Sequence, residues 1–130
     1  MDKRELLIKN CFNSWIEKDS IVFRNSFADD AVYVESWGPA YRNIEHIMAW
    51  FNDWNKENHV LQWDIKEFFH FGNICICEWY FKCDCNNVVA GFDGVSIINF
   101  NETGKIRLIK EFQSKTPNNY PYERIITRKY

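Results

Sequence analysis

Residues 74–100, ICICEWYFKCDCNNVVAGFDGVSIINF, contain two long apolar-rich stretches on either side of Asn86 and Asn87. Neither stretch has helical spacing, and asparagine tolerates the positive φ that tight hairpin turns require. The sequence therefore predicts two antiparallel strands, at 74–84 and 88–100. Such strands are longer than usual and must twist and coil, so we expect a sheet that curves and leaves a cavity.

The surrounding sequence extends this hairpin into a mixed domain. Two further strands are predicted at 60–71 and 105–115, connected through short turns rich in Gly and Asn. Upstream, apolar residues recur three and four positions apart or alternate over a short run. The elements predicted there are helix 4–18, helix 20–26, strand 31–35 and helix 43–56. We expect an α+β fold in which N-terminal helices pack on a strongly curved, mainly antiparallel sheet.

Composition limits the architecture to one domain with a bulky interior. The chain has 130 residues, of which 18% are aromatic, including six Trp and eleven Phe. A chain of this length can bury roughly two thirds of its unfolded surface around one core. The aromatic excess then belongs to the core, a ligand cavity or an interface. We place the domain at residues 1–116 and a polar tail at 117–130.

Charge and cysteine content argue against several classes of partner. The formal net charge is −2 and no long basic run is present, so we expect no nucleic-acid partner. No apolar run reaches the roughly 18 residues of a membrane span, and the N-terminus lacks the pattern of a signal peptide. We therefore expect a cytoplasmic protein, without a membrane partner, whose five cysteines stay reduced.

Four short sequence segments are characteristic: FADDAVY at 27–33, EHI at 45–47, the predicted hairpin at 101–106 and EF at 111–112. Together with the order of the elements, they resemble the NTF2-like superfamily, specifically its SnoaL-like branch. The resemblance covers residues 5–116 and implies a cone-shaped fold around a pocket. This fold hosts isomerases, dehydratases, cyclases, hydrolases and noncatalytic binders, so the resemblance does not choose among these functions.

The ketosteroid isomerase branch of this superfamily allows one mechanism to be compared residue by residue. Its site resembles one built from a tyrosine, an aspartate base and a protonated aspartate. The matching positions in this chain fall near Cys11, Ser36 and Ser96. All three functional side chains are lost, which argues against isomerase chemistry of that kind. A shift of one residue would return Glu35 to the position of the base.

Three acidic residues of the predicted strands are candidates for proton transfer. Glu78 shares a strand face with Ile74 and Tyr80, where it either lines a cavity or is a solvated or ion-paired surface acid. Asp93 lies between two glycines, which either aim it through a bulge or only allow the sheet to bend. Glu111 either faces inward, close to Glu78, or is a surface acid.

Aromatic and charged residues near the turn at 37–40 are candidates for ligand contacts. Trp37, Tyr41 and Arg42 flank this turn at the expected open end of the cone, where they would bind an anionic or aromatic ligand. Trp37 has the alternative role of covering the core. The other predicted ligand-binding residues are Trp15, Glu35, Trp63 and Tyr80.

We predict neither a metal site nor a cofactor. No spacing connects any of the three histidines to a second metal ligand, and His70 is either a lone base or a histidine satisfied within the sheet. The Cys-x-Cys pairs at 75–77 and 83–85 place both sulfurs on one strand face. Zinc sites instead use two to four intervening residues on a turn.

The sequence leaves two functions open. The first is a SnoaL-like protein that binds an apolar or aromatic small molecule, with cofactor-free acid–base catalysis of isomerase, cyclase, dehydratase or hydrolase type. The second is a noncatalytic ligand-binding or protein-interaction module. We also predict a homodimer, because related proteins often pair through the convex sheet face. The apolar row Cys75, Trp79 and Phe81 would otherwise be exposed there.

Overall fold

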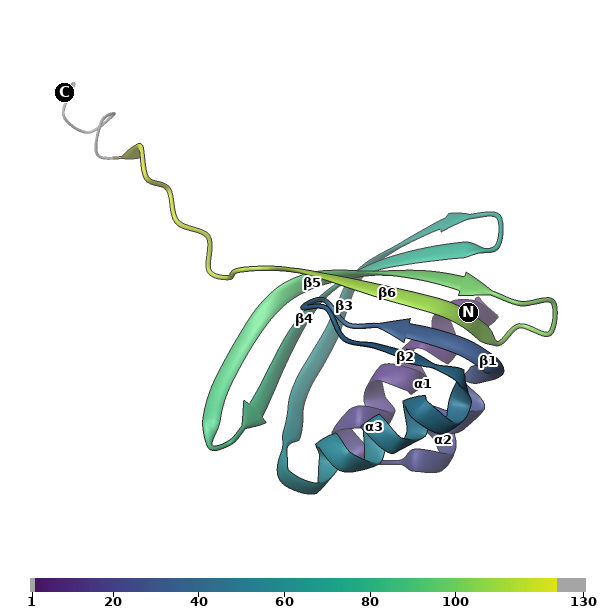
Figure 1. The fold of residues 1–130 in the computed structure, drawn as a ribbon. Coiled ribbons are helices and arrows are strands. Elements are labelled where there is room, and N and C mark those ends of the chain that lie inside the picture. The colour runs from purple at the N-terminus through teal and green to yellow at the C-terminus, as the bar shows by residue number, and fades with distance from the viewer. Residues whose placement is uncertain (1, 124–130) are drawn as a thin grey trace.

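Three helices and one curved six-stranded sheet make up the computed structural model, which describes residues 2–123 (Figure 1). The elements in chain order are α1 (Lys3–Glu17), α2 (Ser20–Asn25), β1 (Phe27–Val34), β2 (Ala40–Arg42), α3 (Asn43–Glu57), β3 (His59–Phe71), β4 (Ile74–Cys85), β5 (Val88–Phe100) and β6 (Ile106–Ser114).

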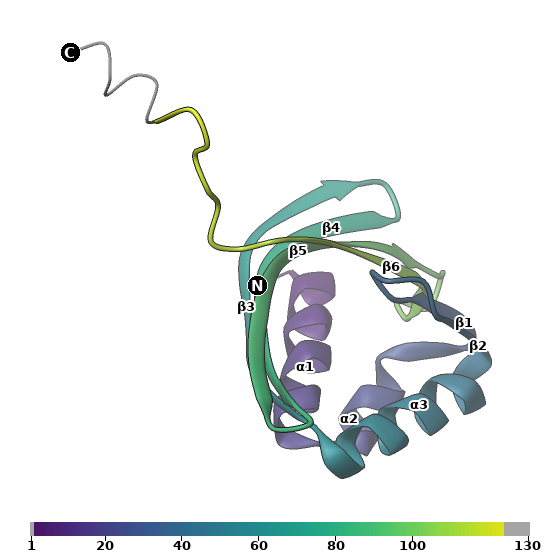
Figure 2. The same cartoon turned by 60° about the vertical axis from the view of Figure 1, so that its left-hand side comes forward.

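The sheet has the strand order β2-β1-β6-β5-β4-β3. Strands β3 to β6 pair as consecutive antiparallel hairpins, which confirms the predicted meander. β1 pairs in parallel with β6, and β2 adds a short antiparallel edge. The sheet bends around α1, while α2 and α3 lie across its open side (Figure 2). The predicted α+β fold with a strongly curved, mainly antiparallel sheet is therefore confirmed.

The first strand differs from its prediction. β1 begins at Phe27, so it includes residues 27–30, which lie between the predicted helix 20–26 and the predicted strand 31–35. Phe27 pairs with Ile106 of β6, but the register shifts before Val32. This irregularity breaks the alternation of side chains that marks a strand in sequence. β2 was not predicted, because three residues carry too little periodicity.

The concave face of β4 packs against the helices. Cys75, Cys77 and Trp79 are buried there, and the ring of Trp79 meets Phe12 of α1 edge-on, with 6.5 Å between centroids. The expectation that this row forms an exposed dimer surface is therefore wrong. Both faces of β4 are apolar, and alternation alone does not indicate which one faces the helices.

Gly94 of β5 leaves the space that Trp79 occupies. The two residues lie opposite each other in the β4–β5 ladder. A Cβ on Gly94 would contact the far ring of Trp79 and would lie 2.7 Å from the carbonyl oxygen of Phe112. A glycine inside a strand is typical of such a close approach.

Some sequence predictions concern features that the fold itself does not decide. The tail begins after β6, and its described part extends away from the sheet (Figure 1). The rest of the predicted tail, residues 124–130, lies outside the described residues.

All five cysteines are free thiols, and the cytoplasmic location stays a prediction. No helix within residues 2–123 is long and apolar enough to cross a membrane.

The contact between Gly94 and Trp79 predicts the effect of one added methyl group. We expect Gly94→Ala to lower the free energy of unfolding by about 1–3 kcal/mol, because overpacked cores are strained by about this amount. Urea unfolding followed by circular dichroism measures the loss. Val89→Ala, a change at an exposed side chain of the same strand, is the control and should change stability by less than about 0.5 kcal/mol. Equal stability of the two variants would contradict the packing described here.

Candidate functional site

A cavity of about 190 Å³ lies between the helices and the concave face of the sheet. All six tryptophans of the chain border it: Trp15, Trp37, Trp50, Trp54, Trp63 and Trp79. The other lining residues are Tyr33, Glu35, Ser36, Val60, Phe81, Cys83, Cys85, Phe92, Glu111 and Gln113. Aromatic walls around a small number of polar groups are typical of ligand pockets.

Glu111 is the carboxyl on the sheet side of this cavity. It shares a strand face with the buried Ile109, so β6 directs it toward the helices. The hydroxyl of Tyr33 donates a hydrogen bond to Glu111 Oε2 at 2.6 Å. Tyr33 is itself buried, and it lies opposite Ile109 in the parallel β1–β6 ladder. Strand pairing therefore brings the acid and its hydrogen-bond donor together.

Glu35 is the second carboxyl of the cavity. It follows the last residue of β1 and lies two positions after Tyr33. The hydroxyl of Tyr41 donates a hydrogen bond to Glu35 Oε2 at 2.7 Å. Tyr41 stacks on Trp50 with 4.4 Å between ring centroids and 11° between planes. This stacking fixes the hydroxyl that holds Glu35 in place.

The two carboxyls differ in how readily they ionise. Burial raises the pKa of Glu111 to about 8, and the negative charge of Glu35 adds to the shift although the hydrogen bond from Tyr33 opposes it. Burial also raises the pKa of Glu35, but hydrogen bonds from Tyr41 and Trp37 favour its carboxylate form. At neutral pH Glu111 therefore holds a proton. Glu35, half-buried and stabilised by two donors, ionises first.

This arrangement has the elements of an acid–base pair. A protonated carboxyl can donate to an atom on which negative charge develops, and a nearby carboxylate can accept a proton. Two carboxyls whose surroundings separate their protonation states are a common basis for assigning these roles. In such a pair Glu111 would be the acid and Glu35 the base.

Six of the predicted site residues belong to this region. Trp15, Glu35, Trp63 and Glu111 border the cavity. Trp37 borders it too, at the rim, where 70% of the side chain is exposed. Tyr41 does not border the cavity and instead holds Glu35.

The other four predicted site residues lie elsewhere. Glu78 and Tyr80 are on the outer face of β4, so their expected place on the cavity wall is wrong. Asp93 lies opposite Tyr80 on that outer face and forms an ion pair with Lys66, with 2.9 Å between Nζ and the carboxylate. The hydrogen bond from Lys66 lowers the pKa of Asp93. Arg42 is exposed and does not line the cavity.

The predicted neighbour of Glu111 is also wrong. Its expected neighbour Glu78 lies on the opposite side of the sheet, and the true neighbours are Tyr33 and Glu35. A signal for Tyr33 was present, because residues 31, 33 and 35 alternate onto one face of a strand. Trp50 and Trp54 also had a signal, since they lie four residues apart on the predicted helix.

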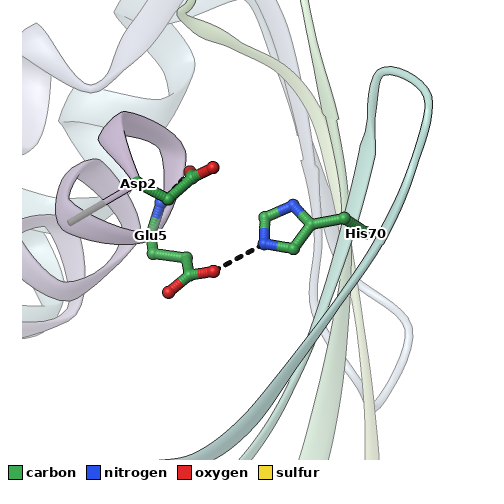
Figure 3. A group of neighbouring side chains, drawn as sticks. All are labelled: Asp2, Glu5 and His70. Carbon is green, nitrogen blue, oxygen red and sulfur yellow. Dashed lines mark hydrogen bonds and ion pairs between the residues drawn. The ribbon is translucent and has the colours of Figure 1, made fainter.

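Asp2, Glu5 and His70 form a second group of chemically capable side chains, with their ligand-type atoms within 4.8 Å of one another (Figure 3). Asp2 accepts hydrogen bonds from the backbone N–H groups of Arg4 and Glu5 and so caps α1. His70 Nε2 lies 2.6 Å from Glu5 Oε2. These contacts attach the start of α1 to β3 and account for the cluster without a metal.

Comparison with known proteins relates this chain to one family by sequence. The family model of the SnoaL-like domain matches residues 8–109. No curated protein matches the chain.

Solved structures relate the chain to one fold. An LEH-like epoxide hydrolase of M. tuberculosis has a TM-score of 0.77 at 13% identity, over 85% of this chain and 82% of that chain. A protein of ketosteroid isomerase-like fold from Catenulispora acidiphila, in complex with trimethylamine, has a TM-score of 0.74 at 14% identity, over 83% of this chain and 85% of that chain. An NTF2-like protein of unknown function from Burkholderia xenovorans has a TM-score of 0.74 at 15% identity, over 95% of this chain and 91% of that chain. At these identities the likeness concerns the fold alone.

The raised pKa of Glu111 predicts a pH dependence of stability. Between the ordinary pKa near 4.5 and the folded value of about 8, the unfolded chain loses a proton that the folded protein retains. Stability should therefore fall across this window, by at most about 1.4 kcal/mol per pH unit. Glu111→Gln cannot ionise, so its unfolding free energy, measured in urea from pH 5 to 8, should fall less steeply.

Glu78→Gln provides the matched control for this measurement, because Glu78 is an exposed acid of the same sheet. Its stability should follow the wild-type dependence on pH. If the Glu111→Gln and wild-type curves were parallel, Glu111 would not hold its proton in the folded protein.

Proposed function

The chain belongs to the SnoaL-like domain family, and we propose that it binds a small apolar or aromatic molecule and transfers a proton with Glu35 and Glu111. The observation that carries this proposal is the buried carboxyl of Glu111, held by the Tyr33 hydroxyl at 2.6 Å beside an aromatic cavity. A carboxyl with a strongly shifted pKa in a concave site is a candidate for acid–base catalysis.

The proposed step moves one proton at each carboxyl. Glu35 accepts a proton from the substrate and becomes neutral. Glu111 donates its proton to the substrate oxygen or nitrogen on which negative charge collects, and its new carboxylate keeps the hydrogen bond from Tyr33. Exchange with solvent then returns both groups to their starting forms. The step needs no cofactor and fits isomerase, cyclase, dehydratase or hydrolase reactions.

The size of the cavity supports a small ligand. Apolar protein cavities of about 150 Å³ hold benzene, so about 190 Å³ suits a single ring or a short branched molecule. The relative from Catenulispora acidiphila was obtained in complex with trimethylamine, a molecule that is smaller still.

A noncatalytic binding module is the second candidate function. The positions that resemble the isomerase site support it: Cys11 is buried and does not line the cavity, and Ser96 accepts a hydrogen bond from Trp79 Nε1 at 2.9 Å. Neither can perform the role of the tyrosine or the protonated aspartate. Such a module would bind the ligand in the same cavity without proton transfer.

A generic carbon acid can distinguish the two functions. In 5-nitrobenzisoxazole, a carboxylate base removes the ring C–H proton as the N–O bond breaks, and the coloured phenoxide product is followed by absorbance. We expect the protein to accelerate this reaction and the rate to rise as Glu35 ionises. Glu35→Gln should lower the rate by about 100-fold, which is typical of the loss of a positioned base.

Glu78→Gln is again the control, since this exposed carboxyl should not affect the rate. Equal rates for the wild type and Glu35→Gln would contradict proton transfer. If calorimetry then still detected the nitrobenzisoxazole bound in the cavity, the noncatalytic module would be the better function. Absence of both binding and turnover would contradict both candidates.

We also propose that the outer face of the sheet joins two copies of the chain. Exposed phenylalanines lie on this face, with Phe71 81% exposed and Phe112 53% exposed. Val95 and Ile97, opposite Phe112 and Lys110, continue the face with partly exposed apolar side chains. Large apolar side chains that are exposed together on one face of a sheet favour an interface. The dimer surface proposed here is therefore not the predicted row Cys75, Trp79 and Phe81, which packs on the concave side of the sheet.

Sedimentation velocity at micromolar concentration tests the homodimer. We expect the wild type to sediment as a dimer and Phe112→Glu to sediment as a folded monomer, because a buried, unpaired charge opposes association. Ile21→Glu changes a side chain that is 72% exposed on α2, away from the outer face, and should remain dimeric. A wild-type monomer would contradict the proposed interface.

A further inference from the structure

We infer that the cavity selects a small organic cation of the methylated-ammonium class, held between aromatic side chains and balanced by the carboxyls of Glu35 and Glu111. This inference deepens the ligand-binding part of the function proposed above and rests on the same cavity. It adds a positive charge to the ligand, which the proposal above described only as small and apolar or aromatic.

The aromatic walls provide the first argument. Nine of the lining residues are aromatic, and six of these are tryptophan, the side chain whose ring face attracts cations most strongly. Two of the indole N–H groups, in Trp15 and Trp63, have no hydrogen-bond partner among the described residues. Phenylalanine would fill a purely structural core without that cost. An indole N–H is a hydrogen-bond donor, for which a cation provides no acceptor, so the ring faces of these tryptophans and not their N–H groups favour a cationic ligand.

The charges of the walls provide the second argument. The lining residues include two glutamates and no lysine, arginine or histidine. An anionic ligand would meet two carboxyls without a partner, which is strongly unfavourable in a buried site. A neutral apolar ligand would gain no binding energy from the charge of either carboxyl. A monocation uses the ring faces and the carboxyls together.

The groups that face Glu111 are uncharged or acidic on every element packed against it. Tyr33 comes from β1 and Glu35 from the turn after it, while Cys11 of α1 and Cys77 of β4 also interact with Glu111 electrostatically. Burial keeps both thiols protonated by raising the pKa of Cys11 to about 12 and that of Cys77 still further. No fixed positive charge in this group of neighbours competes with a cationic ligand.

A bound cation would also change the protonation of the site. In the empty cavity Glu111 has a pKa of about 8, so at neutral pH it is mainly neutral. A cation nearby favours the carboxylate form, so binding should release a proton, and such a cation is a ligand of the site and not a substrate that Glu111 protonates. Affinity should rise between pH 6 and pH 9, because less work is then needed to ionise Glu111.

The experiment compares choline with 3,3-dimethylbutan-1-ol, which has the same shape but a carbon atom in place of the charged nitrogen. Both are small enough for a cavity of about 190 Å³. We expect isothermal titration calorimetry to give choline a Kd at least about tenfold lower, which corresponds to the usual gain from a desolvated cation–π contact. The choline Kd should fall by about tenfold from pH 6 to pH 9.

Matched variants connect the effect to the carboxyls. Glu111→Gln should weaken choline binding at pH 9 and remove most of its pH dependence, while leaving the alcohol unaffected. Glu35→Gln should weaken choline binding as well and serves as the second variant if Glu111→Gln does not fold. Glu78→Gln, on the outer face, should bind both molecules as the wild type does.

The outcomes separate this inference from the proposed function. Equal affinity for choline and the alcohol would overturn the cation inference but not the proposed ligand-binding function of the cavity. Choline binding that did not change with pH or in either variant would have the same consequence. Turnover of nitrobenzisoxazole without choline binding would overturn it in the same way. Selective choline binding without any proton transfer would support the inference and contradict acid–base catalysis.

Discussion

The parallel pairing of β1 with β6 is the constraint on which both the shape and the site depend. It joins the helical N-terminal half to the end of the antiparallel meander, and it brings together side chains 78 residues apart in sequence. Val34 lies opposite Lys110 in this ladder. The residues that follow them in the chain, Glu35 and Glu111, are the two carboxyls of the cavity. Curvature supplies the space, and this pairing supplies the polar groups within it.

Local patterns were sufficient to predict most of the fold. The four strands of the meander have long apolar runs separated by residues suited to tight turns, and the helices have clear spacing, so each element was defined by residues close in sequence. β1 and β2 were harder. The irregular register near Phe27 and the shortness of β2 both reduce the periodic signal.

The site was less predictable, because it depends on which face of each strand is concave. Glu78 and Trp79 are neighbours in β4, and both of their faces are apolar enough for either assignment. Which of the two faces is concave depends on packing that sequence periodicity does not reveal. Trp79 fits the space left by Gly94 and meets the ring of Phe12. Glu111 was identified as a candidate, but its contacts with Tyr33 and Glu35 depend on the long-range pairing of β1 with β6.

The gathering of every tryptophan around one cavity has a spectroscopic consequence. In most proteins the intrinsic fluorescence averages over indoles in unrelated surroundings. Here all of the indole emission originates at the walls of a single site, so quenching, spectral shift and energy transfer from tyrosine all report on that site. The protein therefore contains its own unlabelled optical sensor for whatever enters the cavity.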